Sequence, residues 1–400
     1  MSVGEAVSEL LGAVPGSKLP RIKRLTSFKD PFRFDNDEQF KQVMLETLMH
    51  DASDVFITPG LPICARINGS MMAVTNRPLD DAEVMHILKW TAARETAKTD
   101  IISGKAVNGR YELFDPKERD ARGARLRYGY RVNASPIQVW GGTSCQVVLR
   151  AIPTEPHHYT EIGLNEEIVR AACPRDGIVY IAGATGSGKT TTFAAIIRYI
   201  LENDTPIKGN LVTHEEPIEF TYDTILSDHS IIVQSQVPLH FPNFYAANRE
   251  AMRRKPGLIM IGEMRDEETI RASVEASLTG HPVFGTVHST NIAAVCRRLI
   301  SRFPETERAT AIFDIVETAR FMMAQRLVKG VNGKLLAARE YLVFDAEVRE
   351  ALIDLDQMGK VTGRVKELVE SKGHSFRKEA ARLLEAGLID ESVARSLEKE

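Results

Sequence analysis

Short apolar runs alternate with amphipathic stretches through the middle of the chain. Four runs have the length and composition of buried strands, at residues 178–182, 210–214, 258–261 and 283–286. Apolar side chains at helical spacing follow three of them, over residues 191–203, 266–279 and 305–327. Strands that alternate with helices across short connections predict a parallel sheet that is covered on both faces.

A smaller mixed pattern precedes this region, and a helical, charged pattern follows it. Helices are predicted over residues 37–50 and 80–93, and strands over 54–57, 63–67, 125–135 and 146–150. Near the end, a helix over 377–386 stops at Gly387, and another starts at Asp390 as its N-cap. The predicted fold class is α/β in five parts: a basic flexible segment (1–35), a small α+β domain (36–152), a linker (153–161), the α/β domain (162–345) and a helical C-terminal region (346–400).

Composition disfavours a nucleic-acid-binding, a membrane-spanning and an exported protein. The 400 residues carry a net charge of −3, so the overall field does not attract nucleic acid, and direct nucleic-acid binding is disfavoured. No apolar run approaches the roughly 18 residues that span a bilayer, and the N-terminus lacks a signal-peptide core. The cysteines form no CxxC pair and are expected to be reduced core residues: Cys64, Cys145, Cys173 and Cys296. We expect a cytoplasmic protein that is at most peripheral to a membrane.

A cluster of basic side chains lies in the first 35 residues. Its members are Lys18, Arg21, Lys23, Arg24, Lys29 and Arg33. Two interpretations stay open. The segment is either a solvated tail, or it docks on anionic lipid or on an acidic partner.

The sequence GATGSGKTTT at residues 183–192 follows the first strand of the α/β domain and opens its first helix. It matches the phosphate-binding pattern G-x-x-x-x-G-K-[ST]. The glycines let backbone N–H groups converge on phosphate oxygens, and the helix N-terminus adds the positive end of a dipole. Lys189 is predicted to reach the β- and γ-phosphates, and the Thr190 hydroxyl to complete a Mg²⁺ shell. The predicted nucleotide-binding residues are Gly183, Ala184, Thr185, Gly186, Ser187, Gly188, Lys189, Thr190 and Thr191.

Acidic residues follow two of the other predicted strands. Glu263 ends the hydrophobic stretch 258–262, and Glu215 directly follows the strand 210–214. Because the carboxyl ends of parallel strands share one edge, both carboxylates are expected near the γ-phosphate. Glu263 is the predicted catalytic carboxylate, with Glu215 in support, and both are predicted to hold Mg²⁺ together with Thr190. The alternative for each is a solvated acid at a strand end.

Two histidines, His281 and His288, bracket the last predicted strand. Either they are structural, or they sense the γ-phosphate through N–H donors, which makes both candidates for a catalytic role. The chain has no NKxD motif, so guanine selectivity has no support and ATP is the predicted nucleotide.

Four stretches, in this order, resemble the boxes of the PilT-like secretion ATPase superfamily of pilus motors and type II and type IV secretion ATPases. GATGSGKT is similar to its Walker A motif, EEPIEF to its aspartate box, IMIGEMRDEETI to its Walker B motif and TGHPVFGTVHST to its histidine box. The resemblance runs from about residue 51 to residue 354. The segments FAAIIR, PIEFTYD and REYLVFDAEVRE further resemble the DotB/TraJ branch, which serves Dot/Icm type IVB secretion and IncI-type plasmid conjugation.

The resemblance implies a hexameric ring in which a PAS-like N-terminal domain and a RecA-like ATPase domain clamp each nucleotide. It also implies N-terminal arginines that reach the phosphates, and YRVN and LRAIP nominate Arg131 and Arg150 for that catalytic role. Two arginines on neighbouring strands can neutralise charge that develops on a phosphoryl group. The chain departs from the family in three places. It has Val139 and Trp140 where retraction motors carry another arginine, it lacks the tetracysteine zinc module, and EVREALI only loosely matches AIRNLI.

These observations predict a hexameric, Mg²⁺-dependent ATPase that powers a type IVB secretion or conjugation machine at the cytoplasmic face of the inner membrane. A pilus retraction motor shares all four boxes and is the alternative within the same class. A nucleic-acid translocase is disfavoured because no basic stripe is interleaved with aromatic residues. A nucleotide-gated docking platform without turnover is disfavoured by the presence of Lys189 and Glu263.

Overall fold

The computed structural model describes residues 22–25, 28–92, 94–119, 123–139, 141–153 and 155–398. The chain divides into two compact units. The first comprises Met1–Asp115 and Tyr128–Ala151, and the second comprises Pro116–Arg127 and Ile152–Glu400. The finer domain boundaries that the sequence suggests remain predictions.

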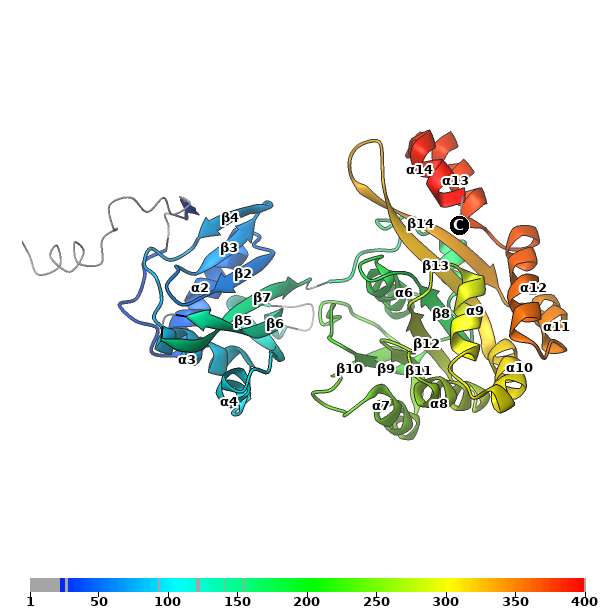
Figure 1. Ribbon diagram of the computed structural model, residues 1–400, viewed down its shortest axis with the longest axis horizontal. Coiled ribbons are helices and arrows are strands. Elements are labelled where there is room, and N and C mark those ends of the chain that lie inside the picture. The colour runs from blue at the N-terminus through cyan, green and yellow to red at the C-terminus, as the bar shows by residue number, and fades with distance from the viewer. Residues whose placement is uncertain are drawn as a thin grey trace, which may run out of the picture. The chain divides into compact units, whose positions relative to one another are not determined.

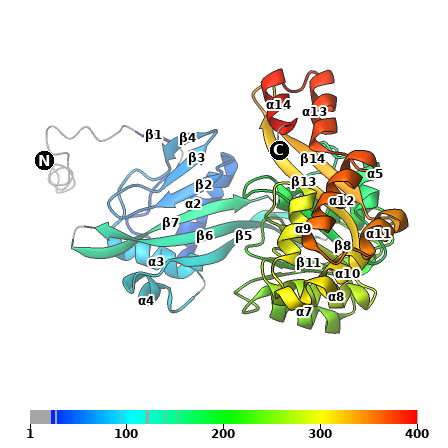
Figure 2. The same cartoon turned by 45° about the vertical axis from the view of Figure 1, so that its right-hand side comes forward.

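The first unit is built on a mixed sheet with the order β1-β4-β3-β2-β7-β6-β5 in the described part of the chain. Its strands are β1 (Lys23–Arg24), β2 (Asp54–Ile57), β3 (Cys64–Ile67), β4 (Ser70–Ala73), β5 (Val107–Arg119), β6 (Arg125–Val139) and β7 (Gly142–Ile152). Helices α2 (Asp37–Met49) and α3 (Asp81–Ala92) share one apolar core with this sheet, and α4 (Ala97–Ile102) follows them (Figure 2). The predicted small α+β domain is confirmed.

Part of the basic N-terminal segment is folded rather than free. Strand β1 pairs with β4 in parallel, and Leu25 and Phe34 are buried in the core of the first unit. Burial of two large apolar side chains stabilises this packing by a few kcal/mol, about 1.5–3 kcal/mol for each. The expectation of a flexible segment up to residue 35 is therefore wrong for residues 22–25 and 28–35. Lys18 and Arg21 lie outside the described residues.

The second unit is built on a sheet with the order β10-β9-β11-β12-β8-β13-β14 among the described residues. Its strands are β8 (Gly177–Ala182), β9 (Gly209–Glu215), β10 (Ser230–Gln236), β11 (Pro256–Ile261), β12 (Pro282–Val287), β13 (Ala319–Lys329) and β14 (Leu335–Val343). Neighbouring strands are parallel except β13 and β14, which pair antiparallel at one edge. Every residue of β8 and β12 is buried, as expected for central strands of a covered parallel sheet.

Helices cover both faces of this sheet (Figure 1). One face packs against α6 (Lys189–Glu202), whose Phe193 and Ile197 share a core with Val179. The other face packs against α7 (Phe244–Ala251), α8 (Glu267–Leu278), α9 (Ile292–Ile300) and α10 (Arg308–Thr318). The short helix α5 (Glu166–Ala171) precedes β8. The predicted RecA-like α/β arrangement is confirmed, although α7 and α9 were not predicted.

The C-terminal region is helical, as predicted. It contains α11 (Ala346–Ile353), α12 (Met358–Ser371), α13 (Phe376–Glu385) and α14 (Glu391–Glu398). Gly387 has φ +66°, and the Asp390 carboxylate accepts a hydrogen bond from the Val393 N–H at 2.9 Å, so the predicted helix end and N-cap are confirmed. Val365 and Leu383 belong to the same core as the sheet, so these helices are packed onto the second unit. In the described part of the chain, every helix is too short or too polar to span a bilayer.

One predicted helix is wrong. The helix expected over residues 305–327 ends at Thr318, and Ala319–Lys329 forms β13, which lies beside β8. The residues at this boundary are good helix formers, but pairing with the central strand overrides that weak intrinsic preference. The consequence is functional, because β13 carries side chains to the phosphate-binding loop.

A fully buried histidine lies on β9, next to Glu215. His214 is 0% exposed, and its ring packs edge-on against Phe241 with ring centroids 5.3 Å apart. Neither ring nitrogen has a hydrogen-bond partner among the described residues. Burial, and then the positive charge of Arg254, lower the pKa of His214 from 6.5 to about 4. The folded chain therefore holds this ring neutral at pH 7.

We expect the second unit to lose stability as the pH falls, because of His214. Its folded pKa lies below its unfolded value, so its contribution is complete above pH 6.5 and is lost as the pH falls toward 4. Between pH 7 and pH 5 this loss is about 2 kcal/mol. Denaturant unfolding of the wild type and of His214→Leu at both pH values measures it. The variant should lose less stability than the wild type, and equal losses would contradict the prediction.

Candidate functional site

The predicted site residues of the second unit gather mainly where the carboxyl ends of its parallel strands meet, which we call the P-loop edge. Strands β8, β9, β11 and β12 are parallel, so their carboxyl ends lie together. The P-loop follows β8, and Glu215 is the last residue of β9. Glu263 comes two residues after β11, and His288 comes directly after β12. Residues from four separate parts of the sequence are thus brought to one place.

The P-loop turns sharply into helix α6. Gly188 is the N-cap of α6 with φ +85°, a left-handed backbone conformation that residues other than glycine rarely adopt. Gly188 has no side chain that could cap the first turn, so the N–H groups at the start of α6 are not used by their N-cap residue and can serve as donors. Together with the helix dipole, these groups form an anion-binding end that suits phosphate oxygens.

Lys189 lies within the P-loop and is only 8% exposed. Its ammonium donates to the carbonyl oxygens of Gly183 and Ala184, at 2.9 and 3.0 Å. An ammonium has three N–H donors, so one remains for a phosphate oxygen. Burial lowers the pKa of Lys189, and the negative charges of Glu263 and Glu219 act in the opposite direction. This cation is therefore partly desolvated, which strengthens its attraction for an anion.

Glu263 and His288 lie beside each other near Lys189. The His288 Nε2 atom is 3.6 Å from a Glu263 carboxylate oxygen, and both side chains are about one-third exposed, at 33% and 28%. Burial and the charge of Lys189 lower the pKa of His288, so its ring is neutral at pH 7. A carboxylate at this position can orient or deprotonate water, and a neutral imidazole beside it can donate one hydrogen bond.

Glu215 is more enclosed than Glu263. It is 5% exposed, and its Oε1 atom accepts hydrogen bonds from the Thr213 hydroxyl and the Gln234 amide, at 2.7 and 3.0 Å. Burial raises the pKa of Glu215, while these hydrogen bonds lower it in part. Its orientation is therefore fixed by neighbours, which suits a supporting role better than direct proton transfer.

The donor set fits Mg²⁺. Mg²⁺ prefers oxygen ligands and is often bound by one or two carboxylates plus substrate phosphates and water. Thr190, Glu215 and Glu263 supply oxygens of this kind at the P-loop edge. Among the described residues there is no cluster of three or more histidine, cysteine or acidic side chains that could hold a metal alone. A cation here would depend on the nucleotide for its remaining ligands.

The two predicted histidines are separated by a whole strand. His281 precedes β12, and its Nδ1 atom lies 3.1 Å from the Thr279 hydroxyl. Six residues of strand span about 20 Å, so His281 lies at the opposite sheet edge from the P-loop. Within one chain, His281 is separated from the P-loop by the length of β12, which favours the structural alternative for it, and the catalytic role of the two histidines remains a prediction.

The two predicted arginines belong to the first unit. Arg131 is half-buried on β6, and Arg150 on β7 donates through Nε to the Asp54 carboxylate at 2.7 Å. Asp54 is 4% exposed. Burial raises its pKa, but the hydrogen bonds from Arg150 and Ser53 bring the value below the usual one. Arg150 therefore has a structural partner of its own, and its action on phosphate remains a prediction.

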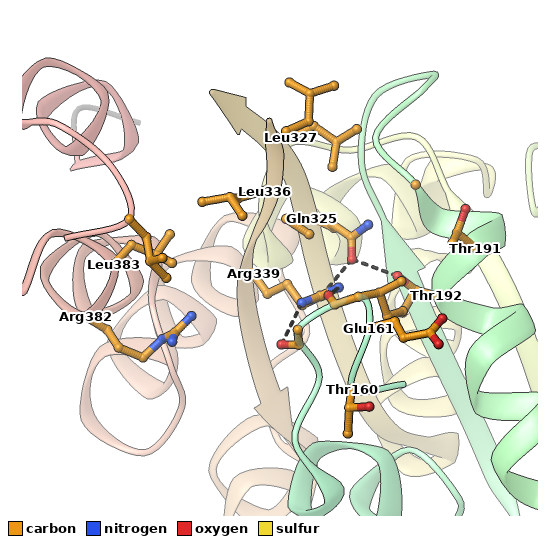
Figure 3. Close-up of a pocket in the computed structure, with 16 residues that line it drawn as sticks. Thr160, Glu161, Thr191, Thr192, Gln325, Leu327, Leu336, Arg339, Arg382 and Leu383 are labelled. Carbon is orange, nitrogen blue, oxygen red and sulfur yellow. Dashed lines mark hydrogen bonds between the residues drawn. The ribbon is translucent and has the colours of Figure 1, made fainter. Parts of the chain in front are cut away.

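A cavity of about 490 Å³ adjoins the P-loop within the second unit, and sequence reasoning missed it. Its walls include Thr191 after the P-loop, Leu327 and Leu336 from β13 and β14, and Leu383 from α13 (Figure 3). A mixture of apolar walls and a few polar groups, at this volume, suits a nucleoside. The sequence signal for β13 and β14 was the Asn332-Gly333 pair, typical of a hairpin turn.

Comparisons with known proteins agree with this geometry. The family described as type II/IV secretion system protein matches residues 37–366. The type IV pilus retraction ATPase PilT of Pseudomonas aeruginosa is 31% identical over 301 residues, which cover 75% of this chain and 81% of that protein.

Two crystal structures are similar over nearly the whole chain. The ATPase DotB of Yersinia pseudotuberculosis is 49% identical with a TM-score of 0.77, and covers 95% of this chain and 99% of its own. The ATPase DotB of Legionella pneumophila is 38% identical with a TM-score of 0.83, and covers 94% of this chain and 98% of its own. The resemblance found in the sequence motifs is confirmed, and this chain belongs to the type II/IV secretion system ATPases of the PilT-like superfamily.

Proposed function

We propose that this chain hydrolyses Mg²⁺-ATP as a homo-hexamer and powers a type IVB secretion or conjugation machine at the cytoplasmic face of the bacterial inner membrane. The observation that carries the enzymatic part is the meeting of Lys189, Glu263 and His288 at the P-loop edge. The similarity to two DotB ATPases over almost the full length supports the type IVB part. Direct nucleic-acid binding is no part of the proposal.

Each residue has a defined task in this function. The N-terminal N–H groups of α6 and the ammonium of Lys189 bind the phosphates. Thr190, Glu215 and Glu263 would hold Mg²⁺, which neutralises phosphate charge when bound. Glu263 orients the attacking water and takes its proton, while Glu215 is fixed by Thr213 and Gln234. His288, beside Glu263, is placed to donate to the γ-phosphate or to the water.

A pilus retraction motor is the alternative, because PilT of Pseudomonas aeruginosa is a relative with good coverage. Complementation separates the two functions. The chain is expressed in a DotB-deficient Legionella strain and in a PilT-deficient Pseudomonas strain, with Lys189→Ala as the inactive control. Restored secretion in the first strain alone supports the proposal. Restored pilus retraction in the second alone would replace it with the motor.

We expect Arg150→Ala to reduce ATP hydrolysis at least about tenfold, with a smaller effect on nucleotide affinity. An arginine that stabilises charge developing in the transition state contributes more to turnover than to ground-state binding. Steady-state phosphate release and equilibrium binding of ADP measure the two effects. Arg131→Ala is tested in the same way, and wild-type turnover in both variants would exclude the first unit from the active site.

The Asp54 contact requires a control, because Arg150→Ala leaves this buried carboxylate without its ion pair and with only the bond from Ser53. The double variant Arg150→Ala with Asp54→Ala removes that carboxylate. If the arginine acts on phosphate, hydrolysis stays low in the double variant. Recovery of turnover there would show that Arg150 acts only through the folding of the first unit.

A further inference from the structure

The side chain of Gln325 reaches the P-loop from β13. Its amide nitrogen donates to the Ser187 carbonyl at 2.6 Å, and its amide oxygen accepts from the Thr192 hydroxyl at 2.8 Å. Ser187 lies in the P-loop, and Thr192 lies in the first turn of α6. Gln325 is 2% exposed, so these bonds form without competition from bulk water. One amide thus bridges the loop and the helix that it opens; Figure 3 shows its contacts with Thr192 and Arg339.

Arg339 continues this contact from the neighbouring strand β14. Its Nε–H donates to the same oxygen of Gln325 at 2.8 Å, and its two terminal nitrogens donate to the carbonyls of Gly163 and Ile162 at 3.1 and 2.7 Å. Gln325 and Arg339 are direct partners in the antiparallel β13–β14 register. A continuous set of hydrogen bonds therefore runs from the P-loop to the segment before α5.

Two P-loop glycines lie close to Gln325, Gly188 to its side chain and Gly183 to its backbone. A Cβ atom at Gly188 would lie 2.8 Å from the Gln325 amide nitrogen, closer than real Cβ contacts allow. A Cβ atom at Gly183 would lie 2.5 Å from the backbone carbonyl oxygen of Gln325, and close to the Ser187 side chain. The P-loop is therefore packed closely against β13 at Gln325, and the Gln325 amide is in direct contact with the turn at Gly188.

The Arg339 guanidinium has no direct bond to a carboxylate in the described part of the chain, although the negative charge of Glu379 acts on it from nearby. Arg339 is 4% exposed. Burial lowers its pKa to about 10, so it still carries its proton at neutral pH. A buried cation that lines the cavity beside Thr191 and Thr192 raises the positive potential where an anion would bind.

We propose that Gln325 and Arg339 are positioning residues for nucleotide binding. They hold the turn at Ser187 and Gly188 in its phosphate-binding shape and connect it to the carbonyls of Ile162 and Gly163. The inference rests on the proposed ATPase function and adds two residues outside the four boxes predicted from the sequence. Because both amide atoms of Gln325 are hydrogen-bonded, its orientation toward Ser187 and Thr192 is fixed.

Gln325→Glu is the variant that separates positioning from folding. Glutamate has the same size and can still accept from Thr192 and Arg339, but it cannot donate to the Ser187 carbonyl. It also neutralises Arg339 and adds negative charge near the phosphates. We expect its thermal midpoint to stay close to that of the wild type, while its Kd for ADP with Mg²⁺ rises about tenfold.

A matched control and a second variant complete the test. Gln357→Glu introduces the same change at the exposed N-cap of α12 and should leave the Kd unchanged. Thr192→Val keeps the side-chain shape, removes one bond to Gln325 and should raise the Kd about threefold. If Gln325→Glu does not fold, the Kd of Thr192→Val tests the inference instead.

Isothermal titration with Mg²⁺-ADP is run on all variants, on the wild type and on Lys189→Ala. Wild-type affinity in Gln325→Glu, or in Thr192→Val where Gln325→Glu does not fold, would overturn the inference if Lys189→Ala has lost binding. A wild-type chain that binds no nucleotide would instead overturn the proposed function. Equal weakening in Gln357→Glu would show that added charge alone lowers affinity, and would also overturn the inference.

Discussion

Replacing Lys189 with alanine is expected to reduce ATP turnover by about 10²-fold or more and to weaken nucleotide binding. The ammonium is partly desolvated within the P-loop and keeps one N–H donor for phosphate after its bonds to Gly183 and Ala184. Alanine removes this charge from a site where electrostatic attraction is strengthened by burial. Phosphate release and ADP titration on the purified variant measure both effects.

The fold is expected to survive this change. Burial lowers the pKa of Lys189, so keeping its charge in place costs folding free energy, and alanine removes that cost. Alanine also removes the bonds to the Gly183 and Ala184 carbonyls, so the thermal midpoint should stay close to that of the wild type. Lys208→Ala, at an exposed lysine that pairs with Asp204, is the matched control and should leave turnover unchanged. Near-normal turnover in Lys189→Ala would contradict the prediction that this loop binds the phosphates of ATP.

The parts of the second unit that the sequence predicted well are those with strong local signals. Strands β8, β11 and β12 are continuous apolar runs because they are buried on both faces, and glycines mark the loop that follows β8. Because parallel strands place their carboxyl ends together, Glu215, Glu263 and His288 could be assigned to one edge before any coordinates. These residues are far apart in the sequence, and the parallel order of the strands is what brings them together.

The parts that the sequence did not predict depend on long-range packing. The run Phe321-Met322-Met323-Ala324 is short and apolar, and such a run does not distinguish a buried strand from a buried helix. Its assignment to a helix hid Gln325, which reaches the P-loop only because β13 pairs with β8. The bond between Arg150 and Asp54 was equally hidden, since 96 residues of sequence separate the two.

Glu263→Gln is expected to separate ATP binding from hydrolysis. The substitution keeps the shape of the side chain but removes the charge that orients the water and accepts its proton. Hydrolysis should fall by about 10²-fold or more, while the affinity for ADP stays within a few-fold of the wild type. His288 loses its charged neighbour, so its ring should become harder still to protonate.

Glu215→Gln and Glu216→Gln test whether the loss of hydrolysis is specific to the Glu263 carboxylate. Glu216 is exposed, with its Oε2 atom 3.8 Å from an Arg265 nitrogen, and it is not among the predicted catalytic or Mg²⁺-binding residues, so the same substitution there should keep wild-type turnover. Glu215 is held by Thr213 and Gln234, so its amide should disturb those bonds and reduce turnover less than Glu263→Gln does. An active Glu263→Gln beside an inactive Glu215→Gln would reverse the two roles, because the enclosed carboxylate would then be the one that accepts the proton.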